Sequence, residues 1–251
     1  MYKIPARTLF AGKNLVYVPQ CHSTNTLAAE LGQKVETPEG TVVITDHQTA
    51  GRGQRGNTWE SQAGKNLTFS LILKPDFLPA KDQFRLNEAI SVGIATYLAS
   101  RVDQPVAIKW PNDILIQDKK VCGILIENHL NNETIGCSIV GIGLNINQRS
   151  FADPNAESVG LITGKEYLLR DEFEALLHAL EVCYLELKKG KKSDLGNRYL
   201  ARLYRKDEIH RFTTGNGEFE GIIVGLNDEG KLRINVGGTE RVFGAKEMAF
   251  V

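Results

Sequence analysis

Two hydrophobic spacings alternate along most of the chain. Short apolar runs bounded by polar or turn-forming residues predict strands, and they lie at about residues 15–18, 41–45, 67–74, 106–109, 113–117, 121–129 and 134–142. Apolar residues three and four apart predict helices. A short helix is expected after Ser23 and a longer one over about residues 81–100. Strands and helices in this order predict an α/β fold.

A further helix is predicted to begin at Asp171, a residue type suited to the N-cap. One apolar stripe then runs along it, formed by Phe173, Leu176, Leu177, Leu180, Tyr184 and Leu187. Lys188 and Lys189 suit its C-terminal end, and Gly190 suits the position beyond. We expect this helix to be structural.

The sequence pattern changes after about residue 205. Short strand candidates are separated by turn signals at residues 215–217, 227–230 and 237–239, which indicates a small β-barrel or sandwich. We therefore expect two domains, residues 1–200 and 201–251. The basic residues near this boundary are expected to form a solvated face; they are Lys191, Lys192, Arg198, Arg202, Arg205 and Lys206.

Composition narrows the class of protein. The 251 residues are 42% hydrophobic and 24% charged, as in ordinary globular proteins. Lys+Arg and Asp+Glu both total 30, which argues against a general nucleic-acid binder. Neither a secretory signal nor a membrane span is predicted, and four scattered cysteines indicate a cytoplasmic protein with reduced thiols. The neighbours Cys21 and His22 are interpreted as structural, because adjacent strand residues face opposite ways.

The most unusual polar segment follows the strand predicted at residues 41–45. It reads Gly51-Arg52-Gly53-Gln54-Arg55-Gly56, with Trp59 just beyond. Glycine lets backbone amides approach an anion, arginine adds a forked cation, and an indole offers a flat face. The spacing matches neither a P-loop nor a dinucleotide-binding turn. We expect a mobile loop that closes over an anionic, partly aromatic ligand, although a solvated loop remains an alternative.

Two further segments carry candidate chemistry. Lys109-Trp110-Pro111-Asn112-Asp113 interrupts two strand-like runs, either as a functional break or as a tight turn. Lys120 opens the next apolar strand, where its ammonium could reach a pocket. A glycine-rich strand, Gly141-Ile142-Gly143-Leu144-Asn145-Ile146-Asn147, would let a ligand lie against bare backbone.

In their order and spacing, these segments resemble the signatures of biotin protein ligases. Lys120 and Gly123-Ile124-Leu125-Ile126-Glu127 complete the set. The resemblance covers essentially the whole chain and implies a mixed-sheet α/β catalytic domain followed by a Src-homology-3-like barrel. It also implies that ATP, Mg²⁺ and biotin form biotinyl-5′-adenylate with release of pyrophosphate. The biotinyl group then passes to a lysine of a biotin carboxyl carrier domain in a biotin-dependent carboxylase.

The resemblance also implies roles for particular residues. Catalysis is assigned to Lys120 and Arg52, which bring two anions together. Biotin binding is assigned to Ser23, Thr24, Asn25, Gln48, Gly51, Arg52, Gly53, Gln54, Lys120, Gly123, Gly141 and Gly143. ATP or adenylate binding is assigned to Arg55, Trp59, Lys109, Asn112, Asp113 and Asn145, with Asp113 as a candidate metal ligand. Ser23 or Thr24 could instead simply cap a helix.

Two departures from the family pattern bear on function. Gln54 replaces an arginine found in some members, which puts retention of the adenylate in question. The motifs begin at Ser23, so no winged-helix DNA-binding domain is expected and the chain is interpreted as a monofunctional ligase. A lipoate or octanoate ligase is the nearest alternative, but its Arg-Arg and Gly-Gly-Gly pattern does not occur here. A non-catalytic, nucleic-acid-binding regulator is the other.

Overall fold

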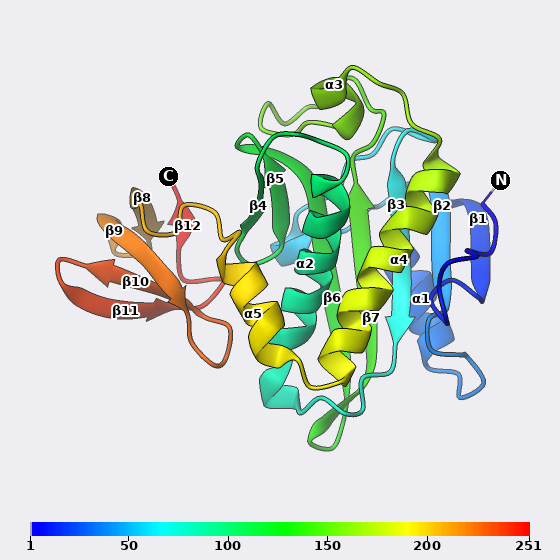
Figure 1. Ribbon diagram of the computed structural model, residues 1–251, viewed down its shortest axis with the longest axis horizontal. Coiled ribbons are helices and arrows are strands. Elements are labelled where there is room, and N and C mark those ends of the chain that lie inside the picture. Colours follow the sequence, from blue (N-terminus) through cyan, green and yellow to red (C-terminus); the bar gives the residue numbers. More distant parts are fainter. Residues whose placement is uncertain (1) are drawn as a thin grey trace.

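The computed structural model describes residues 2–251, with the side chain of Arg55 excepted. A seven-stranded sheet forms the centre of the molecule, in the order β1-β2-β3-β7-β6-β5-β4 (Figure 1). Its strands are β1 (Leu15–Cys21), β2 (Val42–Gln48), β3 (Leu67–Leu73), β4 (Val106–Lys109), β5 (Asp113–Ile116), β6 (Lys119–Asn131) and β7 (Thr134–Leu144). The pair β1 and β2 is parallel and the other neighbouring pairs are antiparallel. The predicted mixed sheet is confirmed.

The helices lie on both faces of this sheet. They are α1 (Thr24–Gly32), α2 (Phe84–Ala99), α3 (Val159–Thr163), α4 (Leu169–Lys188) and α5 (Lys192–Leu200), with 3-10 turns η1 (Gln54–Gly56) and η2 (Ala80–Asp82). Helices α2, α4 and α5 cover the face turned to the viewer in Figure 1, and α1 lies behind β2 and β3. None of the described helices is long and apolar enough to cross a membrane.

Alternation along the strands separates the two faces chemically. Phe69 of β3 and Ile142 of β7 point into the main core under α2 and α4. A smaller core on the other face joins Ala28 of α1 to Ile72 and Ile139. Successive strand residues face opposite ways, so Gly141 and Gly143, which flank Ile142, open onto the α1 face. Bare glycine backbone leaves this face hollow beyond α1.

The apolar stripe of α4 is buried as predicted, from Phe173 to Leu187. The predicted N-cap was wrong, however, because α4 begins at Leu169 with Leu168 as its N-cap. Asp171 lies inside the first turn, where its charge complements the positive end of the helix dipole. Gly190 has φ 81° just beyond the C-cap, in the left-handed conformation that glycine adopts readily.

A second sheet of five antiparallel strands follows, in the order β11-β10-β9-β8-β12. Its strands are β8 (Ile209–Thr214), β9 (Gly217–Leu226), β10 (Leu232–Val236), β11 (Thr239–Phe243) and β12 (Ala249–Phe250). It matches the predicted small C-terminal β domain, whereas the exact division at residues 200 and 201 stays a prediction. Trp110 Nε1 donates to Gly230 O at 2.9 Å and ties this sheet to the β4–β5 turn.

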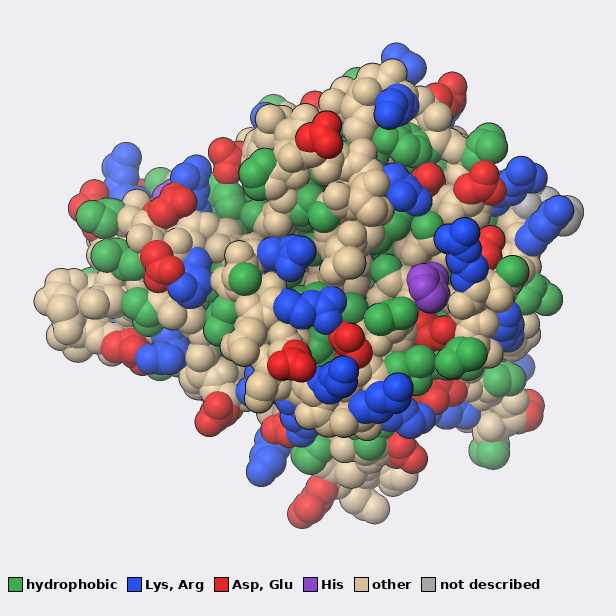
Figure 2. Space-filling view, viewed as in Figure 1, with side chains coloured by type: hydrophobic (Ala, Val, Ile, Leu, Met, Phe, Trp, Pro, Cys, Tyr) green, Lys and Arg blue, Asp and Glu red, His purple; other side chains and the backbone are tan. Residues whose placement is uncertain are grey.

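The basic residues around α5 lie among acidic partners. Lys192 Nζ is 2.7 Å from Asp82 Oδ2, and Arg198 Nη1 is 2.6 Å from Glu186 Oε2. Figure 2 shows this face, where Lys and Arg side chains are interspersed with Asp and Glu. Mixed charge of this kind agrees with the predicted solvated face rather than with a nucleic-acid stripe.

Candidate active site

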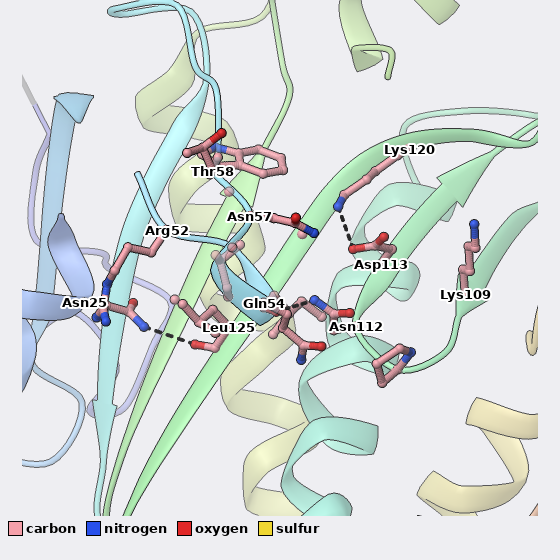
Figure 3. A pocket seen from close by; sticks show the side chains of 18 of the residues that line it. Asn25, Arg52, Gln54, Asn57, Thr58, Lys109, Asn112, Asp113, Lys120 and Leu125 are labelled. Carbon is pink, nitrogen blue, oxygen red and sulfur yellow. Dashed lines mark hydrogen bonds and ion pairs between the residues drawn. The ribbon is translucent and has the colours of Figure 1, made fainter. Parts of the chain in front are cut away.

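A cavity of about 270 Å³ occupies the hollow face of the main sheet. The start of α1, the loop at residues 51–59, the β4–β5 turn and β12 surround it. Figure 3 shows that Arg52, Gln54 and Asn57 of the loop lie on one side, and that Asp113 and Lys120 lie on the other. The predicted glycine-arginine loop and the predicted strand break therefore meet across one cavity.

Glycines form the floor of this cavity. A Cβ added at Gly143 would overlap the indole of Trp59, and one added at Gly141 would overlap the amide of Asn25. A Cβ at Gly123 would lie 3.0 Å from Trp59 Cζ3. Glycine is required at the first two positions because the Trp59 and Asn25 side chains rest directly on the strand backbone.

Basic side chains gather around this floor. Lys120 Nζ lies 2.8 Å from Asp113 Oδ1 and 5.7 Å from the centroid of the Trp59 ring. Lys109 Nζ lies 5.0 Å from the centroid of the Phe250 ring. Arg52, from the loop, is the third cation of the lining. Two of these three cations are paired with carboxylates, Lys120 with Asp113 and Arg52 with Glu127. Cationic donors of this kind suit a ligand with several negative charges.

A polar wall closes the α1 end of the cavity. Gln48 Oε1 accepts a hydrogen bond from the Thr24 backbone N–H at 2.8 Å. Ser70 Oγ donates to Asn25 Oδ1 at 2.5 Å. Ser23 occupies the N-cap position of α1, yet its side chain makes no capping hydrogen bond. Side-chain capping therefore does not account for the Ser23 hydroxyl, which lines the cavity instead.

Most residues assigned from the sequence come together here. The cavity lining includes Ser23, Thr24, Asn25, Gln48, Arg52, Gly53, Gln54, Trp59, Lys109, Asn112, Asp113, Lys120, Gly123, Gly141 and Gly143. Gly51 instead lines a second cavity, which shares Arg52 and Gly53 with the first. Asn145 is buried outside the lining, and its Nδ2 donates to Glu157 O at 3.1 Å. The side chain of Arg55 lies outside the described part of the chain.

Several contributors to the site were not predicted. Thr68 lines the cavity and Ser70 supports its wall. Their signal was a pair of polar residues two apart in an otherwise apolar strand, which places both on one face. Met248, Ala249 and Phe250 also line the cavity. Nothing in the sequence connects this terminal strand to motifs more than a hundred residues away.

The cysteines near the site do not have the character of nucleophiles. Burial, reinforced by the Asp113 carboxylate, raises the pKa of the Cys122 thiol well above its ordinary value. Burial also raises the pKa of Cys21, although a hydrogen bond with Thr45 opposes the shift. Thiolate is the nucleophilic form, so the raised pKa argues against Cys21 as a nucleophile, and the structural interpretation of the pair with His22 stays a prediction. The described residues contain no group of three or more His, Cys, Asp or Glu that could hold a metal ion.

The fold and this cavity define an α/β protein with a glycine-floored cavity lined by Arg52, Lys109 and Lys120. Residues 17–145 match the model of the biotin/lipoate A/B protein ligase family. The chain belongs to this family and is an enzyme, a ligase.

Individual relatives confirm the resemblance to biotin protein ligases. The bifunctional ligase/repressor BirA of Bacillus subtilis is 31% identical over 245 residues, which cover 95% of this chain and 75% of the relative. The biotin–[acetyl-CoA-carboxylase] ligase of Paracoccus denitrificans is 32% identical over 215 residues, or 83% of this chain and 89% of the relative. The biotin protein ligase of Aquifex aeolicus, solved with biotin and ATP, superposes with a TM-score of 0.79 at 27% identity, covering 95% of this chain and 99% of that one.

Proposed function

We propose that this chain is an ATP-dependent biotin protein ligase that forms biotinyl-5′-AMP and transfers the biotinyl group to a lysine of a biotin carboxyl carrier domain. The observation that carries the proposal is the cavity itself, in which a glycine floor, a polar wall and three cations converge. The Aquifex aeolicus structure, which holds biotin and ATP, has the same fold and supports this choice of ligands.

The polar wall suits the fused-ring head of biotin. Gln48 Oε1 is engaged by Thr24, so the Nε2 amide hydrogens of Gln48 remain to donate to a carbonyl. Ser23, at the start of α1, adds a hydroxyl to the same wall. Gly141 and Gly143 line the same cavity, where the Asn25 amide and the Trp59 indole that rest on their backbone border the space proposed for the rest of the vitamin.

The first reaction joins two anions. A carboxylate oxygen of biotin attacks the α-phosphorus of ATP, the bond to the bridging oxygen breaks, and pyrophosphate leaves. Arg52 and Lys120 stabilise the charge that builds up on the phosphoryl oxygens. The ion pair of Lys120 with Asp113 fixes the ammonium beside the cavity before substrates arrive.

The nucleotide is assigned to the end of the cavity near the β4–β5 turn. Lys109 supplies charge there, Asn112 supplies an amide and Trp59 an aromatic face. Arg55 and Asn145 remain proposed contacts. Mg²⁺ prefers phosphates and one or two carboxylates, and Asp113 is the one carboxylate among the described residues that line this cavity.

The second reaction forms an amide. The carrier lysine attacks the carbonyl carbon of the mixed anhydride, AMP leaves with the bonding electron pair, and the amine loses a proton. The name of the Paracoccus denitrificans relative supports an acetyl-CoA-carboxylase carrier as the acceptor. We expect a cytoplasmic enzyme without duplex-DNA binding, which the net charge of zero supports.

The experiment is direct. The protein is incubated with biotin, MgATP and a biotin carboxyl carrier domain, and the carrier is weighed by mass spectrometry. A mass increase of one biotinyl group that requires ATP is expected. Lipoate in place of biotin should give no adduct. An unmodified carrier, or one modified by lipoate, would contradict the proposal and favour the alternative ligase class.

A further inference from the structure

A single carboxylate oxygen joins two parts of the cavity wall from distant segments. Glu127 Oε2 accepts a hydrogen bond from Asn25 Nδ2 at 2.8 Å and another from Arg52 Nη2 at 2.8 Å. Asn25 is buried in the first turn of α1, whereas the Arg52 side chain, in the loop at residues 51–59, is 45% exposed. Glu127 does not line this cavity, and its hydrogen bonds reach it through these two partners.

Glu127 also helps to fix which way the Asn25 amide faces. The Nδ2 group of Asn25 donates its two hydrogens to two acceptors, Leu125 O at 3.2 Å and the Glu127 carboxylate. The Oδ1 atom of Asn25 accepts a hydrogen bond from Ser70 Oγ. An ionised carboxylate and a carbonyl accept but cannot donate. A flipped amide would therefore place Oδ1 against two acceptors, which is unfavourable.

The resulting wall has a defined polarity. Asn25 has both amide hydrogens engaged, so its free capacity toward a ligand is a lone pair on Oδ1. Gln48 instead offers a donor to a ligand, because its Oε1 accepts a hydrogen bond from Thr24 and its Nε2 is left to donate. A cavity lining that offers both a donor and an acceptor is complementary to a cyclic urea, in which a carbonyl is flanked by N–H groups. This match rests on the proposed function, in which biotin supplies the urea.

We propose that Glu127 is a positioning residue that couples the wall of the biotin site to the loop above it. Its pair with Arg52 is half exposed, with side-chain exposures of 45% and 36%, and exposed pairs contribute little as pure charge attraction. Its effect is geometric. One oxygen holds the Asn25 amide in its acceptor orientation and holds Arg52 at the cavity mouth, so the two residues act as one unit.

Biotin affinity measured by titration calorimetry tests this inference. Glu127→Ala is expected to weaken biotin binding about tenfold, as for loss of hydrogen bonds to a charged group. Glu127→Gln should retain most of the affinity, because its amide oxygen can still accept both hydrogen bonds. Glu133→Ala, which removes an exposed carboxylate at the turn between β6 and β7, is the matched control and should bind as wild type does.

A double-mutant comparison separates positioning from a merely structural role. With Glu127 present, the double variant Asn25→Ala/Arg52→Ala should lose less biotin affinity than the product of the two single fold-losses, because the two residues share a partner. In the Glu127→Ala background, the fold-loss of biotin affinity in the double variant should equal the product of the two single fold-losses. Three results would overturn the inference. Biotin affinity could be unchanged in Glu127→Ala, it could fall equally in Glu127→Ala and Glu127→Gln, or the fold-losses of the Asn25 and Arg52 variants could multiply in both backgrounds. Wild-type protein that does not bind biotin would instead contradict the proposed function.

Discussion

Gly141 and Gly143 determine where the Asn25 and Trp59 side chains can lie. Both face the hollow side of β7, and any larger residue would collide with Asn25 or Trp59. The glycine-rich run was visible in the sequence, and the prediction that a ligand lies against its backbone stays a prediction. The sequence did not show that Trp59 rests on that backbone, because the contact joins a loop to a strand more than eighty residues later.

Gly143→Ala is therefore expected to displace the indole of Trp59. The added methyl group would overlap its ring, and the exposed loop can move more easily than the central strand. We expect a red shift in tryptophan fluorescence, because the indole gains contact with water. Gly215→Ala is the control, since a Cβ there meets nothing within 4 Å. An emission maximum that stays at the wild-type position in Gly143→Ala would show that the contact is not what holds Trp59.

The two assigned catalytic cations give a second prediction. Arg52→Ala and Lys120→Ala should fold normally, because both side chains are partly exposed. Each should slow biotin-dependent pyrophosphate exchange by a factor corresponding to about 2–4 kcal/mol of lost transition-state stabilisation.

Lys119→Ala is the matched control for Lys120→Ala. The Lys119 ammonium donates to Pro154 O at 2.8 Å and does not line the cavity. The rate of pyrophosphate exchange in Lys119→Ala should stay near that of wild type. Near-wild-type exchange in Arg52→Ala or in Lys120→Ala would remove that residue from the mechanism.

Among the elements, strands and long helices followed from hydrophobic spacing because each has one buried side. The helix α5 was not predicted, since its nine residues include Gly196 and several charges and bury only Leu195, Gly196 and Tyr199. The cap at Asp171 was misplaced because the helix N-cap, Leu168, makes no side-chain capping hydrogen bond. Sequence patterns locate buried faces better than they locate helix ends.

The loop at residues 51–59 is the element expected to move. Its internal hydrogen bonds are few, including Gly53 N to Asn57 O at 2.7 Å and Trp59 N to Gly51 O at 2.9 Å. Such segments open readily. Hydrogen exchange should show these amides exchanging quickly in the free protein and slowly with biotin and ATP. The amides of β3, already bonded to β2 and β7, serve as the internal control. Equal protection of the loop in both states would contradict a closing lid.

At the scale of the whole molecule, the C-terminal sheet completes the site. Met248 and Phe250 line the cavity although they lie beyond every motif. Phe250 also packs against Phe212, with ring centroids 5.4 Å apart, which fixes its ring to the second sheet. The sequence correctly predicted a small C-terminal β unit, whereas the division into two domains stays a prediction. It could not predict that this unit would contribute to the cavity, because that depends on how the two sheets pack.

Phe250→Ala tests this contribution. Loss of the ring beside Lys109 should raise the KM for ATP about two- to thirtyfold, the range expected for a cation–π contact of about 0.5–2 kcal/mol. The KM for biotin should change little, because biotin is assigned to the α1 end of the cavity. Val242→Ala, at an exposed position of β11, should leave both constants unchanged. A Phe250→Ala enzyme with the wild-type KM for ATP would limit the C-terminal sheet to a structural role.

The central claim is that one cation-lined cavity joins the carboxylate of biotin to the α-phosphate of ATP. Exchange of labelled pyrophosphate into ATP by the wild-type protein tests it most directly, because the first half-reaction needs no carrier. The account predicts exchange that requires biotin and is unaffected by excess lipoate. Exchange that proceeds without biotin, or no exchange with biotin and MgATP present, would contradict it.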